Sequence, residues 1–151
     1  MPYVPAAELN DYVGKDLGYS AWLTIDQARI NLFAEATDAF GYVYVDPVRA
    51  ADSPFGGTIA HGFLSLSLAS KLMKGIMVLP QGLKIMFNYG LDKVRFLQPV
   101  KVNSKVRLKI TLVEVTEKQP GQWLLKTTAT LEIEGEEKPA YIAELLALCV
   151  V

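Results

Sequence analysis

The residues that are able to do chemistry gather in two short stretches of the sequence. The first stretch, residues 36–47, reads ATDAFGYVYVDP and offers the carboxylate Asp38 together with three aromatic side chains at alternate positions. These aromatics are Phe40, Tyr42 and Tyr44. The second stretch, residues 55–62, reads FGGTIAHG and contains His61, the only histidine of the chain. Carboxylates and imidazoles serve general acid–base catalysis, whereas aromatic residues with hydroxyl groups line and orient ligands in apolar pockets. The two stretches therefore indicate either a catalytic site or a ligand pocket.

Other kinds of site chemistry find little support in the sequence. His61 alone cannot make a zinc site, because such sites need three or four protein ligands, so we expect neither a metal nor a cofactor. The single cysteine, Cys149, lies in a strand-like run near the end of the chain. Core packing is a better interpretation of it than a nucleophile. One cysteine also excludes an internal disulfide and fits a reducing compartment, so we expect a cytoplasmic protein.

Length and charge limit the class of protein and its partners. The chain has 151 residues, which predicts one domain spanning residues 1–151. Its formal net charge of −1 gives no electrostatic attraction to nucleic acid or to an anionic membrane. The longest apolar run, Tyr141–Val151, is interrupted by Glu144 and is too short to span a bilayer. No secretory leader opens the sequence, and we expect neither nucleic acid nor membrane among its partners.

The first half of the chain must position these residues with short helices and loops. Pro5–Gly14 is typical of a short helix, with proline near its start and glycine past its end. A second helix is predicted from about Thr24, where TIDQ resembles a capping box. Its apolar face would hold Ile30, Phe33 and Ala34. Asp46 is the predicted N-cap of a third short helix, residues 48–52, with Pro47 at its first position.

The most helix-like segment is Ile59–Lys74, which Gly75 would end. It is apolar almost all round, so we expect it to be buried. Three serines, Ser65, Ser67 and Ser70, would then act as small packing residues.

From Leu83 onward the hydrophobic period changes to two, which predicts strands. The predicted strands span residues 83–99, 105–117, 123–134 and 139–151. Because short turns join them, the sheet should be antiparallel. One buried helix followed by a long antiparallel meander predicts an α+β architecture in which the sheet wraps the helix.

This order of elements, with FGGTIAHG (residues 55–62) and VDP (residues 45–47) within it, resembles the MaoC-like dehydratase family. The sequence is similar to (R)-specific enoyl-CoA hydratases within that family, and the likeness continues through NYGLDKVRFLQPV, residues 88–100. The resemblance implies the hot-dog fold, in which a curled antiparallel sheet wraps one long central helix. It also implies homodimers whose sheets join edge to edge, with acyl-CoA sites near the interface.

The family's hydratase signature reads G-D-x-x-x-x-H-x-D-P, and its aspartate and histidine activate the water that adds to an enoyl thioester. Aligned on Asp46-Pro47 without gaps, the histidine of the signature falls on Tyr44 and the aspartate on Ala39. By the same resemblance, the backbone N–H of Gly62 receives the thioester oxygen as negative charge develops there. Asp38 is one position out of register and is better interpreted as a turn residue, although a carboxylate there could still reach a water.

Nine residues are predicted to bind a ligand, on the basis of the aromatic stretch, the resemblance and the small or flexible residues near them. They are Ala39, Phe40, Tyr42, Tyr44, His61, Gly62, Ser70, Met86 and Phe87. In the family, the face that carries the aromatics looks into the acyl-chain tunnel. Within this set His61 is better interpreted as a hydrogen-bonded structural histidine.

Two functions of different classes follow. Because Ala39 and Tyr44 stand at the two signature positions, the first interpretation is a non-catalytic binding protein for a small apolar ligand or acyl-CoA. Small residues such as Ala28 and Ala69 and the loss of both side chains suggest that this pocket was engineered. The alternative is a working (R)-specific enoyl-CoA hydratase that acts on acyl-CoA thioesters and uses Asp38 or another base.

Overall fold

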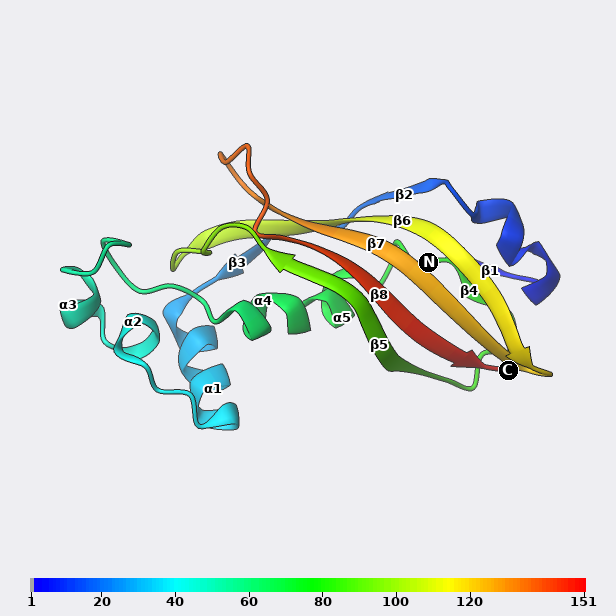
Figure 1. Ribbon diagram of the computed structural model, residues 1–151, viewed down its shortest axis with the longest axis horizontal. Helices are drawn as coiled ribbons and strands as arrows, with labels where there is room; N and C mark the ends of the chain where they lie inside the picture. Colours follow the sequence, from blue (N-terminus) through cyan, green and yellow to red (C-terminus); the bar gives the residue numbers. More distant parts are fainter. Residues whose placement is uncertain (1) are drawn as a thin grey trace.

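The computed structural model describes residues 2–151. Most of it is a curled antiparallel sheet that wraps a pair of short helices (Figure 1). The sheet has six strands: β2 (Asp16–Tyr19), β3 (Leu23–Ile25), β5 (Ile85–Phe96), β6 (Ser104–Gln119), β7 (Gln122–Ile133) and β8 (Tyr141–Val150). Their order is β2-β6-β7-β8-β5, and β3 also pairs with β6. A short parallel pair, β1 (Tyr3–Val4) with β4 (Leu79–Pro80), lies apart from this sheet. The α+β prediction is confirmed.

The inner face of the sheet is apolar because its residues alternate. Along β6, every second side chain from Val106 to Leu112 is completely buried. Along β7, every second side chain from Leu125 to Ile133 is buried, and Thr127 contributes the one hydroxyl among them. Both alternations agree with the predicted strands, since successive side chains of a strand point to opposite faces.

The central helix begins later than predicted and is divided in two. It consists of α4 (Gly62–Ser67) and α5 (Ala69–Leu72), followed by turns at residues 73–76. Ile59 instead forms a β-bridge with Lys101, and the Ala60 N–H donates to the Val100 carbonyl at 2.8 Å. This extended pairing holds the backbone of residues 59–60 out of the helix.

The prediction that this helix is buried all round is also wrong. One side packs on the sheet through Leu64, Leu68 and Leu72, all of which are buried. The other side carries Phe63, which is 69% exposed, together with exposed serines at positions 67 and 70. The helix therefore leaves one side uncovered, and Phe63 is the large apolar side chain on it.

The N-terminal helices differ from the prediction mainly in where they begin. The first, η1 (Ala6–Tyr12), is a 3₁₀ helix. The second, α1 (Gln27–Thr37), starts three residues after Thr24, because Thr24 belongs to β3 and pairs with Lys105. Its cap is Asp26, whose side chain accepts a hydrogen bond from the Arg29 N–H at 2.9 Å. The third short helix, α3 (Pro47–Ala50), has the predicted cap: the Asp46 carboxylate accepts from the Arg49 N–H.

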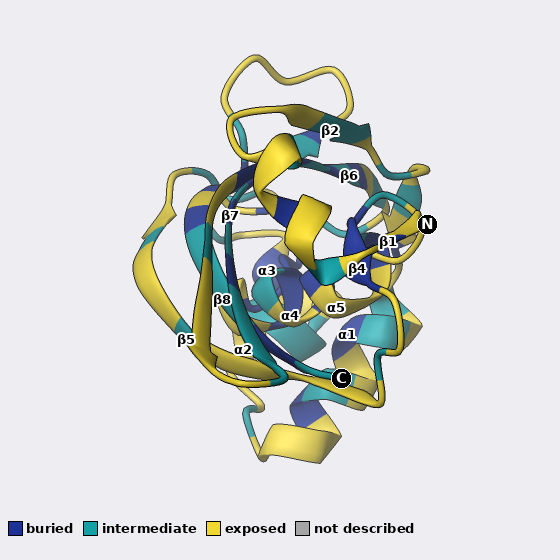
Figure 2. Ribbon diagram, turned by 90° about the vertical axis from the view of Figure 1, so that its right-hand side faces the viewer, coloured by how far each residue is buried: buried dark blue, intermediate teal, exposed yellow. Residues whose placement is uncertain are grey.

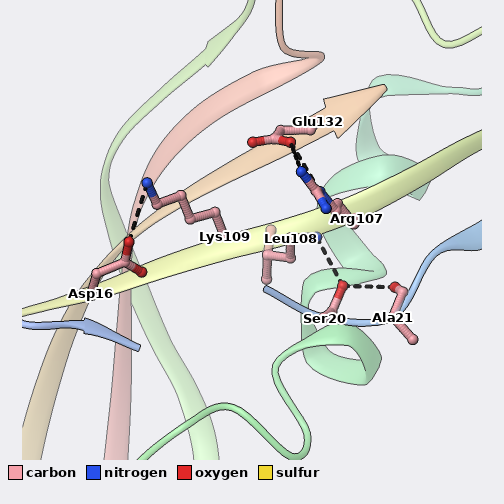
Figure 3. Close-up of polar contacts among 7 residues, drawn as sticks. All are labelled: Asp16, Ser20, Ala21, Arg107, Leu108, Lys109 and Glu132. Atoms are coloured by element: carbon pink, nitrogen blue, oxygen red, sulfur yellow. Dashed lines mark hydrogen bonds and ion pairs between the residues drawn. The ribbon is translucent and has the colours of Figure 1, made fainter. Parts of the chain in front are cut away.

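Polar contacts accompany the pairing of the edge strand β2 with β6 (Figure 3). Lys109 of β6 lies 3.2 Å from the Asp16 carboxylate, and the Ser20 hydroxyl accepts a hydrogen bond from the Leu108 N–H. The pKa of Asp16 is lowered, first by the hydrogen bond from the Gly18 N–H and then by Lys109. Because the Asp16–Lys109 ion pair is exposed, it fixes the register of β2 more than it adds to stability.

Strand β5 forms one edge of the sheet and is open along its length. Figure 2 shows it largely as exposed ribbon, although it carries apolar side chains. Those of more than a third exposure include Ile85, Met86, Phe87, Tyr89 and Leu91. A long apolar edge is a template for pairing with another strand. Within residues 2–151, none of the helices is long and apolar enough to cross a membrane.

We predict that Tyr141→Phe leaves the protein as stable as before or raises its free energy of unfolding by up to about 1 kcal/mol. Tyr141 is fully buried, its hydroxyl has no hydrogen-bond partner within residues 2–151, and burial raises its pKa. Removing the hydroxyl therefore removes a desolvation penalty and no bond. Urea unfolding measures the change, with Leu131→Ala as a control that should destabilise by about 2–5 kcal/mol. A clear loss of stability in Tyr141→Phe would contradict the prediction.

Candidate functional site

A cavity of about 240 Å³ lies at the start of α4. We call it the α4 cavity. Its polar lining side chains are Tyr44, Ser65 and Gln98, and its other walls include Gly62, Phe96 and Ala140. Three parts of the chain thus meet here: the residue 36–47 stretch, the beginning of α4, and the segment that follows β5. The cavity combines apolar walls with a few convergent polar groups, which is the usual composition of a small-molecule site.

Tyr44 belongs to α2 (Tyr42–Val45), a single helical turn whose N-cap is Gly41. Its ring stacks on the His61 ring, with centroids 3.9 Å apart and planes inclined by 20°. A Cβ added at Gly41 would lie 3.1 Å from the Tyr44 ring, so the absence of a side chain there leaves room for this position. Tyr44 is therefore fixed on two sides while it lines the cavity.

The prediction that Phe40, Tyr42 and Tyr44 share one face of an extended segment is wrong. Because residues 42–45 are helical, alternate side chains point in nearly opposite directions. Phe40 is 52% exposed, and the Tyr42 ring packs against the Arg49 guanidinium, 4.1 Å from its centroid. Of the three aromatics, only Tyr44 reaches the α4 cavity.

His61 is buried between two aromatic rings, Tyr44 and Phe33, the latter with its centroid 5.0 Å away. Its Nε2 lies 2.9 Å from the Ala39 carbonyl oxygen. Since a carbonyl only accepts, Nε2 donates and carries the proton, and Nδ1 has no hydrogen-bond partner within residues 2–151. This geometry agrees with a hydrogen-bonded structural histidine that joins the stretch at residues 36–47 to the start of α4.

Gly62 is the first residue of α4, so its N–H is one of those without an acceptor inside the helix. A Cβ at this position would lie 3.2 Å from the Phe96 ring. Phe96 in turn packs edge-on against Tyr141 and Phe63, with each pair of centroids 6.2 Å apart. The lack of a side chain at residue 62 thus lets an aromatic wall approach the helix start closely.

The remaining predicted residues lie elsewhere. Ser70, Met86 and Phe87 line a second and larger cavity of about 690 Å³, which we call the β5 groove. Residues of α4, α5, β5 and β8 form this groove, and none of them also lines the α4 cavity. Ala39 lines neither cavity and contributes its carbonyl to His61. Of the nine predicted residues, Tyr44 and Gly62 line the α4 cavity and three line the β5 groove. The other four line neither cavity: Ala39, Phe40, Tyr42 and His61.

Asp38 and the buried thiol take structural positions. Asp38 is exposed and caps the end of α1 with a left-handed backbone, φ 57°, which agrees with the turn interpretation. Cys149 is buried and unpaired, and burial raises the pKa of its thiol to about 11. Within residues 2–151, no group of three His, Cys, Asp or Glu side chains is placed to hold a metal ion.

The sequence did not reveal the cavity-lining roles of Ser65, Phe96 and Gln98. It also gave no sign of a further residue of the site, Gln27. Its side chain contacts the backbone of Tyr44 and the hydroxyl of Thr58. The contacting residues lie 17 and 31 positions away in the sequence, so no local spacing could have revealed them.

Comparison with known proteins gives a consistent result along nearly the whole chain. The family described as MaoC like domain matches residues 8–135. The chain is 45% identical over 138 residues to 3-hydroxyacyl-thioester dehydratase Z of Mycobacterium tuberculosis, covering 91% of each protein. It is 42% identical over 149 residues to nodulation protein N of Rhizobium meliloti, covering 98% of this chain and 92% of the relative.

Solved structures confirm the fold. An R-hydratase from Pseudomonas aeruginosa, PhaJ1, superposes with a TM-score of 0.74 at 24% identity, covering 98% of this chain and 86% of that one. A MaoC-like dehydratase from Rhodospirillum rubrum gives a TM-score of 0.73 at 18% identity, covering 94% and 95%. The predicted hot-dog fold and the resemblance to the MaoC-like family are both confirmed.

The interpretation of the chain as a non-catalytic, engineered binding protein is wrong. It is overturned by relatives named as dehydratases that match 91% of both chains. That interpretation depended on two side chains, Ala39 and Tyr44, within one short motif. The similarity instead extends across the sheet, the central helices and the segments around the α4 cavity.

We predict that Gly62→Ala pushes the Phe96 ring outward, because the new Cβ would stand 3.2 Å from it. Gly57→Ala is the matched control: it makes the same chemical change in the same approach to α4, where a Cβ would meet no atom within 4 Å. The control should gain up to about 1 kcal/mol of stability by restricting the unfolded chain, and Gly62→Ala should gain less.

Thermal unfolding gives the stability of each variant, and crystal structures give the Phe96 position. An unmoved Phe96 ring in Gly62→Ala, with stability equal to that of Gly57→Ala, would contradict the prediction.

Proposed function

Because the chain belongs to the MaoC like domain family, we propose that it is a hydratase–dehydratase that interconverts 3-hydroxyacyl thioesters and enoyl thioesters. The observation that carries the proposal is the 45% identity to a 3-hydroxyacyl-thioester dehydratase over 91% of both chains. In the dehydration direction the α-carbon loses a proton and the β-carbon loses its hydroxyl group. Water leaves and a carbon–carbon double bond forms.

The α4 cavity has groups suited to this reaction. Loss of the α-proton places negative charge on the thioester oxygen, and a backbone N–H at a helix start stabilises such charge. Gly62 supplies an N–H of this kind beside the cavity. The Tyr44 hydroxyl can both donate and accept a hydrogen bond, so we assign to it the orientation of the substrate's 3-hydroxyl group or of the added water.

The assignment of the signature's aspartate and histidine to positions 39 and 44 stays a prediction. It has a direct test, since the double variant Ala39→Asp with Tyr44→His supplies both side chains of the signature. The proposal for the present chain depends instead on the helix start, on Tyr44 and on the polar side chains Ser65 and Gln98 that share the cavity.

We propose acyl-CoA as the form of the thioester substrate and the β5 groove as the place of its apolar tail. The groove volume of about 690 Å³ lies within the range of ligand pockets, roughly 300–1,000 Å³. Met86 and Phe87 give it apolar walls, and Ser70 contributes a hydroxyl at its helical side. These three residues thus retain the ligand-binding role predicted for them, as part of the proposal.

We also propose that two copies of the chain pair along β5. This strand is the edge of the sheet, and its exposed apolar side chains would become covered by a second copy. Antiparallel pairing of two β5 strands would extend the sheet across the dimer and satisfy the unpaired backbone groups of both edges. A cytoplasmic location is likewise a proposal, supported by the unpaired and buried Cys149.

We predict that the purified protein hydrates crotonyl-CoA, followed as loss of the ultraviolet absorbance of the conjugated thioester. Tyr44→Phe should lower kcat/KM by up to about tenfold, because it removes one neutral hydrogen bond while it keeps the ring on His61. Tyr42→Phe is the matched control and should have no effect, because Tyr42 belongs to the same helical turn but does not line the cavity. The proposed function would be refuted if the protein neither hydrates short and long enoyl thioesters nor dehydrates the corresponding 3-hydroxyacyl thioesters.

We predict that the 16.6 kDa chain sediments as a dimer and that Leu91→Glu dissociates it. Leu91 lines the β5 groove at the edge strand, where a charge would be buried by the second copy. Ile142→Glu is the control, because it places the same charge on an exposed position of the neighbouring strand β8. A monomeric parent chain, or a dimer that Leu91→Glu leaves intact, would contradict the β5 pairing.

A further inference from the structure

The side-chain amide of Gln27 lies at the point where three segments of the site join. Its Nε2 donates to the Tyr44 carbonyl at 2.7 Å and to the Asn31 Oδ1 at 2.9 Å. Its Oε1 accepts a hydrogen bond from the Thr58 hydroxyl at 2.5 Å. Both donors and the acceptor of the amide are therefore used, and the partners come from α1, from α2 and from the segment that leads into α4.

The partners of Gln27 are themselves well anchored. Thr58 is 2% exposed, and its carbonyl accepts a hydrogen bond from the Val102 N–H at 3.0 Å. The next residue, Ile59, donates its N–H to the Val43 carbonyl at 2.9 Å, directly beside Tyr44. Gln27 thus reinforces a backbone contact between the segment that carries Tyr44 and the segment that carries Gly62.

Gln27 acts on the one cavity-lining side chain of the residue 36–47 stretch. The side chain of Tyr44 lines the α4 cavity, and its backbone carbonyl accepts a hydrogen bond from the side-chain amide of Gln27. Gln27 itself is absent from the lining of that cavity. Any influence of Gln27 on a substrate must therefore pass through Tyr44 and through the segment at residues 58–62.

We infer that Gln27 is a positioning residue of the proposed reaction: its amide fixes Tyr44 relative to the start of α4. The inference rests on the proposed function, since it concerns the geometry of that same site. A displacement of a reacting group by about 1 Å can reduce turnover on the order of a hundredfold. Hydrogen bonds from a side chain outside the cavity are sufficient to prevent such a displacement.

The decisive variant is Gln27→Glu, which keeps the size and shape of the side chain. A carboxylate still accepts from the Thr58 hydroxyl, but it has no N–H for the Tyr44 carbonyl and places a second acceptor at 2.7 Å from it. We expect kcat for enoyl thioester hydration to fall by up to about tenfold, as in Tyr44→Phe, with a much smaller change in KM. Asn31→Ala is the matched control, because it removes the other acceptor of the same Nε2 and leaves the Tyr44 bond in place.

Crystal structures of both variants supply a readout that does not depend on activity. We expect the Tyr44 ring to leave its stack on the His61 ring in Gln27→Glu and to keep that stack in Asn31→Ala. If Gln27→Glu does not fold, Gln27→Met removes the hydrogen bond to the Tyr44 carbonyl without adding a charge, and it also removes the acceptor of the Thr58 hydroxyl. An unmoved Tyr44, or an undiminished kcat, in the Gln27 variant overturns the inference. If the unaltered protein hydrates no thioester, the proposed function fails by itself, and the Tyr44 position still decides whether Gln27 holds it.

Discussion

Burial of the inner face of the sheet beneath α4 and α5 is the constraint on which the rest of the structure depends. The alternating apolar residues of β6 and β7 leave one continuous surface that must be removed from water. Leu64, Leu68 and Leu72 cover it, and this packing fixes the axis of the helical pair. Since the axis is fixed, the position of the first residue, Gly62, is fixed as well. The α4 cavity then lies between this helix start and the segment that follows β5.

The strands were predictable because their signal is local. In β6 the alternation from Val106 to Leu112 needs no knowledge of distant residues, and the structure buries all of its apolar members. The start of the central helix was not predictable in this way. Ile59 has a helix-compatible sequence around it, yet its bridge to Lys101, 42 residues later, holds it extended. Local propensity is a weak signal where a tertiary pairing competes with it.

The candidate site was only partly predictable for a related reason. The spacing of Phe40, Tyr42 and Tyr44 indicates an extended segment, but residues 42–45 form a single turn of helix. The contacts that decide the position of Tyr44, those with His61 and Gln27, join residues 17 positions apart in the sequence. Positions 39 and 44 belong to one short motif, whereas the similarity to a 3-hydroxyacyl-thioester dehydratase covers 91% of this chain and contradicts a non-catalytic protein.

A helix of one turn cannot hold its own shape, because helix nucleation fixes several residues for very few hydrogen bonds. The shape of residues 39–45 must therefore come from outside that segment. Three carbonyls receive donors from other elements: His61 donates to Ala39, Ile59 to Val43, and Gln27 to Tyr44. Two of these donors are side chains that do not line the α4 cavity. The position of Tyr44 in the α4 cavity therefore depends on His61 and Gln27, although neither residue lines that cavity.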